Sequence, residues 1–324
     1  MNFLLFFYHF FSYLCTIMIY LIIAIICGSM FAVIFRIFQS HNVDSEQAIM
    51  FNYLTGVIVS IIPILTSDAP MPDGWLADSV LSYRTLLALV EGALFVCGFT
   101  IMDWSTWRNG IALTTAAARA SLILPVVFSW LFLSQPSPAW LPVVMIIVAL
   151  ILIVVPNKPQ EREIKRFKSD ASRARKAALT LSAVFVFYGT SDFLMKIIQN
   201  AVEIEYSGNS SLTELHLNLL TVTLFIMATL LSFIICLAKG RFRKNGLTLR
   251  TTIGGIILGL ANTGCTTCML RGLGSLPTGI YYPIYNIGIV SLAAIIGLTF
   301  FHEKLTRVQY LGLVIAVIAI ALSF

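Results

Sequence analysis

Apolar runs of nearly bilayer length alternate with short polar segments along this chain. A hydrocarbon core requires about 20 apolar residues per helix, and ten segments approach or reach that length. The predicted helices are 18–38, 48–65, 85–103, 111–133, 140–155, 177–198, 215–237, 251–269, 279–300 and 308–324. The period-two alternation of a membrane barrel does not occur, so helices are the expected spanning elements. The pattern therefore predicts an all-α integral membrane protein with ten transmembrane helices.

The longest polar stretch divides these helices into two groups of five. It reads PNKPQEREIKRFKSDASRARK over residues 156–176. We expect two five-helix halves, 18–156 and 177–324, joined by a basic linker at 157–176. Residues 1–17 are rich in Phe and Tyr and contain no Lys or Arg, so they lack the basic start of a signal peptide and form an N-terminal extension.

Composition agrees with lipid as the surrounding medium. Hydrophobic residues make up 58% of the chain and charged residues 11%, with a mean hydropathy of +0.91, whereas soluble domains are about 25% charged. This excludes an ordinary soluble enzyme, a nucleic-acid binder and a disordered scaffold. The net charge of +6 resides mainly in loops, where it orients a membrane protein.

The distribution of Lys and Arg predicts the topology. Loops after odd-numbered spans carry 17 of these residues, against 3 after even-numbered spans. Cytoplasmic loops hold the excess of positive charge, so the odd loops, including the linker, should be cytoplasmic. With ten spans, both termini then face outward. We expect a multi-pass protein of the cell inner (plasma) membrane.

Short motifs recur in the same order in the two halves. Each pair is weak alone, but the offsets between partners are similar. The pairs are Gly28-Ser29 with Gly189-Thr190, Asn52 with Asn218, and Leu131 to Gln135 with Thr299 to Glu303. A repeat of five spans must insert its second copy upside down, which is the inverted-repeat plan of secondary transporters.

The closing segment carries a family resemblance. It contains Gly279-Ile-Tyr-Tyr-Pro-Ile-Tyr-Asn286, then Gly297-Leu-Thr-Phe-Phe-His-Glu303-Lys-Leu-Thr306 and Gln309-Tyr-Leu-Gly312. Together with the five-plus-five pattern and the basic linker, it is similar to the EamA-like branch of the drug/metabolite transporter superfamily. In the first half Gln135 stands where that family often has Glu. The resemblance implies small-molecule transport by alternating access, usually export, with a cavity between the two repeats.

Charged residues inside predicted spans require an explanation, because a charge at the bilayer centre costs about 2.5–3.5 kcal/mol on insertion scales. Arg119 cannot lose its charge; it either faces a cavity or forms a structural ion pair with Glu91. Glu91 and Asp192 are candidate proton-coupling residues. Asp192 also has Lys196 four residues later, the favourable order for an intrahelical pair, and Lys196 is near enough to the predicted span end to reach the interface.

Uncharged polar residues complete the candidate substrate site. Tyr281, Tyr285 and Asn286 surround Pro283, which removes a backbone donor from the predicted ninth span. Asn262 adds an amide to the eighth span. Rings and amides of this kind suit a small polar substrate, although an interfacial aromatic belt is the alternative. If Arg119 contacts the substrate, the substrate carries an anionic group, and an amino acid or a similar zwitterion fits.

Two other classes of function remain open at this point: a membrane-embedded enzyme, and a channel or accessory subunit that does not transport. The sequence contains no Walker loop, zinc-protease motif or hydrolase motif, so we expect no enzyme, no cofactor and no metal, and any pumping must use a gradient. Cys265 and Cys268 have the spacing of a redox pair but are expected to be packing residues. The expected partners are a small-molecule substrate and the lipid bilayer, without nucleic acid, and a homodimer is compatible with the pattern.

Overall fold

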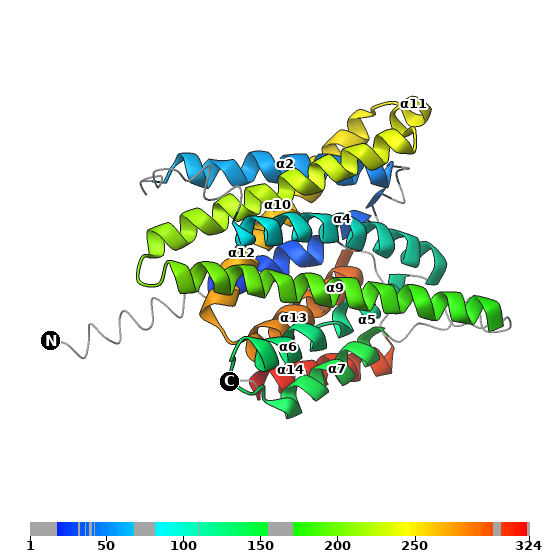
Figure 1. Ribbon diagram of the computed structural model, residues 1–324. Coiled ribbons are helices and arrows are strands. Elements are labelled where there is room, and N and C mark those ends of the chain that lie inside the picture. Colours follow the sequence, from blue (N-terminus) through cyan, green and yellow to red (C-terminus); the bar gives the residue numbers. More distant parts are fainter. Residues whose placement is uncertain are drawn as a thin grey trace. The chain divides into compact units, whose positions relative to one another are not determined.

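The chain is almost entirely helical where its structure is described. The computed structural model describes residues 18–67, 82–154 and 171–322, apart from residues 32, 36, 39–40, 42, 110 and 301–305. The predicted N-terminal extension at 1–17 and most of the linker at 157–176 therefore lie outside the described residues. All regular elements in the described ranges are α-helices (Figure 1), which confirms the prediction of an all-α protein for that part of the chain.

The helices fall on the apolar segments of the sequence. After an N-terminal helix at Met18–Phe35, they are α2 (Ser45–Leu65), α4 (Tyr83–Asn109), α5 (Ile111–Ala120), α6 (Ile123–Phe132), α7 (Trp140–Val154), α9 (Ala171–Glu205), α10 (Ser210–Ala238), α11 (Arg241–Asn245), α12 (Leu249–Ser275), α13 (Thr278–Phe300) and α14 (Arg307–Ala321). The segments long and apolar enough to span a membrane are Met18–Phe35, Ser45–Leu65, Tyr83–Ser105, Arg175–Glu205, Ser210–Ala238 and Leu249–Ser275. They indicate a membrane protein; the full number of spans stays a prediction.

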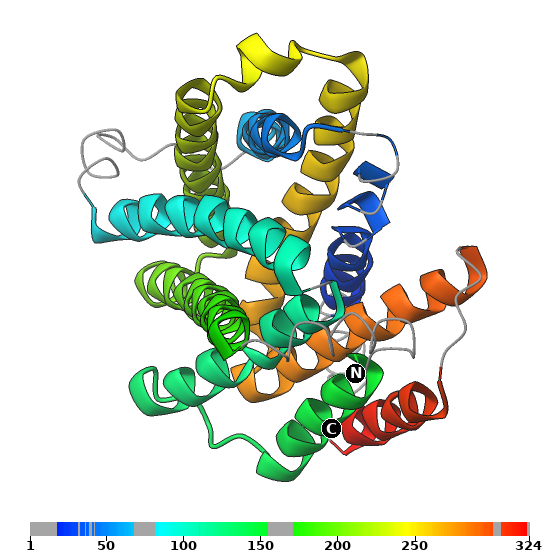
Figure 2. The same ribbon diagram turned by 90° about the vertical axis from the view of Figure 1, so that its right-hand side faces the viewer.

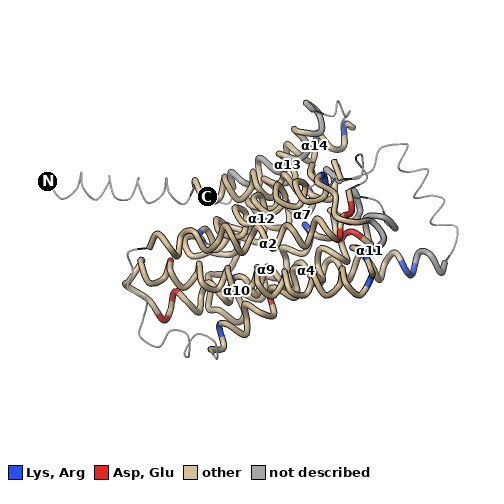
Figure 3. Tube along the Cα trace, turned by 90° about the horizontal axis from the view of Figure 1, so that it is seen from above, with Lys and Arg blue, Asp and Glu red and all other residues tan. Residues whose placement is uncertain are grey.

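Helix α2 shows the distribution of side chains expected in lipid. Ile58 and Ile62 are 59% and 55% exposed, whereas Asn52 is 0% exposed. Charged residues of α2 and α10 are confined to the ends of these helices (Figure 3). Water does not solvate a helix that exposes its apolar side chains and buries its polar ones. This arrangement fits a bilayer.

Polar side chains cap the helices at their N-termini. The Asp44 carboxylate accepts hydrogen bonds from the backbone N–H groups of Glu46 and Gln47, which starts α2. The Asn209 side chain accepts from the Leu212 N–H at the start of α10, and the Thr248 hydroxyl accepts from the Thr251 N–H at the start of α12. Each cap satisfies a donor that the first helical turn leaves unpaired.

The chain forms two compact units, and neither is one half of the sequence. The first contains residues 1–93 and 197–276, and the second contains residues 94–196 and 277–324. Each unit thus takes helices from both predicted five-helix halves. Within the first unit α2 packs between α10 and α12 (Figure 2). Within the second, α7 packs against α14, α13 and α5.

Contacts at glycines fix the relative direction of neighbouring helices in the first unit. A Cβ atom at Gly255 would lie 2.6 Å from the Ala48 oxygen, and one at Gly259 would lie 2.6 Å from the Asn52 oxygen. The two contacts shift by four residues in the same direction on both helices, so α2 and α12 run parallel, and Gly255 and Gly259 are packing residues. By contrast α10 runs antiparallel to α2, since its end contacts the start of α2 through Lys239 and Glu46, and Phe225 lies against Gly56 further along.

In the second unit α6 and α9 run parallel. Leu124 lies against Gly189, and the rings of Phe128 and Phe193 meet edge to face at 5.4 Å. The end of the α6–α7 connection lies at the start of α13, where a Cβ atom at Gly279 would lie 2.9 Å from Pro138. These contacts bring α5, α6, α9 and α13 together around the residues considered next.

The predicted span at 111–133 is interrupted as an α-helix. Ser121 and Leu122 form a tight turn between α5 and α6, although Leu122 keeps right-handed helical torsions (φ −50°, ψ −24°). Pro125 has no N–H to donate to the Ser121 carbonyl, which instead accepts from the Leu124 N–H at 2.9 Å. The Ser121 hydroxyl donates to the Ala118 carbonyl at 2.6 Å, so the turn before the break has a polar partner of its own.

Candidate functional site

The first part of α13 places four polar side chains in the interior. Tyr281, Tyr282, Tyr285 and Asn286 are all at most 5% exposed. The rings of Tyr281 and Tyr285, one turn apart, stack at 5.8 Å with an interplanar angle of 17°. Pro283 lies inside the helix, where it offers no N–H to the preceding turn. The buried positions argue against an interfacial aromatic belt for these tyrosines.

Arg119 and Asn286 are in direct contact. Arg119 lies in the last turn of α5, just before the break. Its Nη1 donates to Asn286 Oδ1 at 3.3 Å, and Asn286 Nδ2 donates to the Tyr282 carbonyl at 3.0 Å. Arg119 Nε is buried and has no hydrogen-bond partner among the described residues. Asn286 thus orients a guanidinium that keeps unused donor capacity.

Asp192 and Tyr188 on α9 belong to the same group of residues. The Tyr282 hydroxyl donates to the Asp192 carbonyl, which joins α13 to α9. The Tyr188 hydroxyl donates to Met102 Sδ at 2.7 Å. Arg119 interacts electrostatically with both Asp192 and Tyr188. Contacts through α13 therefore place Arg119 and Asp192, which have opposite formal charges, in one group of residues of the second unit.

Two candidate residues lie in the other unit. Asn262 on α12 and Glu91 on α4 are 3% and 0% exposed, so both are interior polar groups as expected. They belong to the first unit and Arg119 to the second. The pairing of Arg119 with Glu91 and the membership of Asn262 in the substrate site therefore stay predictions.

Lys196 differs from its prediction. The sequence placed it near a span end, where its amine could reach the interface. Helix α9 continues to Glu205, and Lys196 is only 3% exposed. The helix is longer than its apolar run because polar residues after Ile198 still pack: Gln199 donates to Glu203 at 2.6 Å, and Gly274 of α12 lies against Gln199.

Tyr188 was missed by sequence reasoning. It precedes Asp192 by one helical turn, so both lie on one face of α9, and this spacing was the available signal. Its hydroxyl oxygen retains the capacity to accept hydrogen bonds, since its proton is directed to sulfur. Among the described residues no group of three or more His, Cys, Asp or Glu side chains could hold a metal ion.

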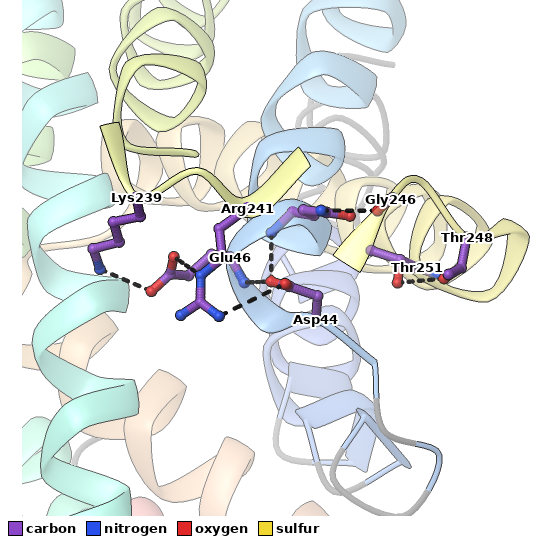
Figure 4. Close-up of polar contacts among 8 residues, drawn as sticks. Asp44, Glu46, Lys239, Arg241, Gly246, Thr248 and Thr251 are labelled. Carbon is purple, nitrogen blue, oxygen red and sulfur yellow. Dashed lines mark hydrogen bonds and ion pairs between the residues drawn. The ribbon is translucent and has the colours of Figure 1, made fainter. Parts of the chain in front are cut away.

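An ion-pair cluster lies at the start of α2, and consists of Asp44, Glu46, Lys239 and Arg241 (Figure 4). Glu46 accepts from Lys239 Nζ at 2.8 Å and from Arg241 Nε at 2.7 Å. The hydrogen bond to Glu46 raises the pKa of the Arg241 guanidinium above its ordinary value. Lys239 at the end of α10 and Arg241 of α11 thus both bind Glu46 of α2.

Gln47 extends this contact. Its Nε2 donates to the Gly246 carbonyl at 3.0 Å, so the α11–α12 connection also meets α2 (Figure 4). The side chain is fully buried. The cluster therefore joins the first predicted half to the second within the first compact unit.

The chain is similar to known proteins whose names state no activity. No family model matches the sequence. An uncharacterized protein of Haemophilus influenzae is 26% identical over 305 residues, which cover 93% of this chain and 95% of that protein. A protein of known crystal structure superposes with a TM-score of 0.66 at 10% identity, over 94% of this chain and 96% of its own. At that identity the likeness shows a shared fold alone.

Proposed function

We propose that this chain is a secondary transporter that moves a small polar metabolite, an amino acid or a similar solute, across the cytoplasmic membrane by alternating access, in the direction of export. We also propose membership of the EamA-like branch of the drug/metabolite transporter superfamily, with ten spans in two inverted repeats. The observation that carries the proposal is a partly buried guanidinium, Arg119, beside the turn between α5 and α6 and oriented by Asn286.

A fixed positive charge inside a membrane protein is costly and is generally retained for function. Arg119 has a neutral hydrogen-bond partner in Asn286 and no direct ion pair among the described residues. A guanidinium in this state can accept a carboxylate through two parallel hydrogen bonds. The stacked Tyr281 and Tyr285 lie in the same part of α13 as Asn286, and their rings combine apolar faces with polar edges, as groups of small-molecule sites do.

The helix directions support the proposed order of spans. All odd-numbered spans must cross a bilayer in one direction, and all even-numbered spans must cross it in the opposite direction. The second and eighth proposed spans, α2 and α12, run parallel, and the seventh, α10, opposes α2. The fourth and sixth, α6 and α9, run parallel. The N-terminal helix opposes α12, because Phe38 meets Gly254 and Cys27 meets Gly264.

The proposal is tested by ligand binding to purified protein. A thermal-shift screen against amino acids, nucleosides, amines and sugars should give its largest stabilisation with solutes that carry a carboxylate, since ligands that bind only the folded state raise its stability. Arg119→Lys should abolish the shift, whereas Glu91→Gln should retain it. Equal shifts for wild type and Arg119→Lys would remove Arg119 from the site. A loss of folded protein in both variants would indicate a structural pair instead.

A further inference from the structure

Asp192 and Arg119 form the two poles of one polar region in the second unit. Tyr282 and Asn286 lie one turn apart on α13, so their side chains project from the same face. Asn286 accepts a hydrogen bond from Arg119 of α5, and Tyr282 donates to the backbone of Asp192 on α9. One turn of α13 therefore fixes the positions of both oppositely charged residues.

The two charges interact without touching. Arg119 acts electrostatically on Asp192, yet no ion pair or hydrogen bond connects the guanidinium to that carboxylate in the described part of the chain. Buried opposite charges that stay apart forgo the attraction that would offset their desolvation. A solute with one anionic and one cationic group, placed between them, would supply a direct partner to each.

The surroundings of Asp192 suit an ammonium group. An ammonium presents three N–H donors and needs acceptors. The Asp192 carboxylate is one acceptor, and the Tyr188 hydroxyl oxygen, one turn earlier on the same face, is another because its proton is directed to Met102. At the other pole Arg119 retains a buried Nε–H without a partner, which suits an anion.

We propose that Asp192, with Tyr188, binds the cationic group of a dipolar solute whose anionic group is held by Arg119. This inference rests on the proposed function, and it assigns Asp192 to substrate selection rather than to proton coupling. A bound ammonium favours the ionised form of the carboxyl. Solute and site then each carry no net charge. A simple anion would leave Asp192 without a partner, and a simple amine would leave Arg119 without one.

The experiment compares ligands that differ in one charged group. The twenty standard L-amino acids are screened against the purified full-length chain, and the tightest binder is compared with its 2-hydroxy acid and with its decarboxylated amine. Wild type should bind the amino acid at least about tenfold more tightly than either analogue, because losing one partner of a desolvated charge pair is costly. Equal binding of the hydroxy acid, or no binding of any amino acid, would overturn the proposal.

Variants separate the role of Asp192 from that of Arg119. Asp192→Asn should lower affinity for the amino acid to that for the hydroxy acid and leave the hydroxy acid unaffected. Tyr188→Phe should lower the affinity for the amino acid by a smaller factor. Glu203→Gln, the same kind of change on an exposed carboxylate of α9, is the matched control and should leave all three affinities unchanged. The wild-type comparison stands on its own if Asp192→Asn does not fold.

The remaining outcomes discriminate between the inference and the proposed function. If Asp192→Asn keeps the wild-type order of ligands but loses uptake driven by a pH gradient in proteoliposomes, Asp192 is a proton carrier and the inference is wrong. If the hydroxy acid binds as tightly as the amino acid and Arg119→Lys abolishes both, the proposed transporter site stands without an ammonium subsite. If substitution of Arg119 leaves the affinity for every ligand unchanged, the proposed site itself is wrong.

Discussion

At the scale of single residues, the buried polar side chains of α13 organise the charged groups around them. Asn286 is 1% exposed and uses both ends of its amide, accepting from Arg119 and donating to the Tyr282 carbonyl. A buried amide with both functions satisfied fixes its own rotamer. Arg119, which has four side-chain torsions to settle, is thereby held in one orientation. In the proposed site Asn286 is therefore a positioning residue, which would act on a solute through Arg119.

Substitution of Asn286 separates positioning from mere packing. Asn286→Leu should weaken binding of carboxylate ligands about tenfold, which corresponds to one lost hydrogen bond to a charged group. Asn286→Asp should weaken it further, because the new carboxylate pairs with Arg119 and competes with the ligand. A purely structural role predicts the reverse order, with Asp the milder change. Titration of carboxylate ligands followed by intrinsic fluorescence would distinguish the two orders.

The sequence identified residues of this candidate site by their type, but it did not predict the contacts between them. Arg119 and Asp192 are conspicuous because charges are rare in apolar runs. The contact between Arg119 and Asn286 joins residues 167 positions apart, and helical periodicity carries no information on that distance. Tyr188 was overlooked because a tyrosine in an apolar helix looks like packing. Its role depends on Met102, which lies on another helix.

At the scale of helices, small residues decide how closely neighbours approach. Gly255 and Gly259 on α12 let the backbone of α2 come within contact distance of α12. Their spacing is the sequence signal for this role, since small residues four apart form such contacts in membranes. The apolar pattern did not locate the turn between α5 and α6, because Pro125 lies inside an uninterrupted apolar run and a proline in a membrane helix is often tolerated.

Substitution of Gly259 tests the contact between α2 and α12. A Cβ atom there would meet the Asn52 oxygen and the Thr55 side chain, each at 2.6 Å, and backbone cannot easily yield. Gly259→Ala should lower stability by about 1–3 kcal/mol, the cost of overpacking. Gly98→Ala is the matched control, because its nearest neighbour, the Tyr188 ring, would lie at an ordinary 3.8 Å. Equal thermal stabilities of the two variants would contradict this packing.

At the scale of the whole molecule, the compact units cut across the sequence. The unit boundaries fall within α4 and α9 and between α12 and α13, not at the basic linker that marks the middle of the chain. Hydropathy locates helices along a chain but does not say which of them pack together. The first unit is also joined by charge: the ion-pair cluster of Asp44, Glu46, Lys239 and Arg241 connects helices from the two halves of the sequence.

The predicted orientation concerns the whole chain, and cysteine labelling tests it. In a chain whose native cysteines are replaced, Ser207→Cys in the acidic α9–α10 connection should react with a membrane-impermeant maleimide in intact cells. Ser169→Cys in the linker should react only after the membrane is opened, because the excess of Lys and Arg places that loop in the cytoplasm. Labelling of Cys at position 169 in intact cells would reverse the topology.

The central claim is that Arg119 binds the transported solute, and solute uptake tests it most directly. Purified protein in proteoliposomes loaded with unlabelled amino acids should accumulate a labelled amino acid by exchange, with saturable kinetics. Arg119→Ala, reconstituted at equal density, should lose this uptake by at least about a hundredfold, as expected for removal of a buried charged anchor. Uptake by Arg119→Ala at the wild-type rate would contradict the account.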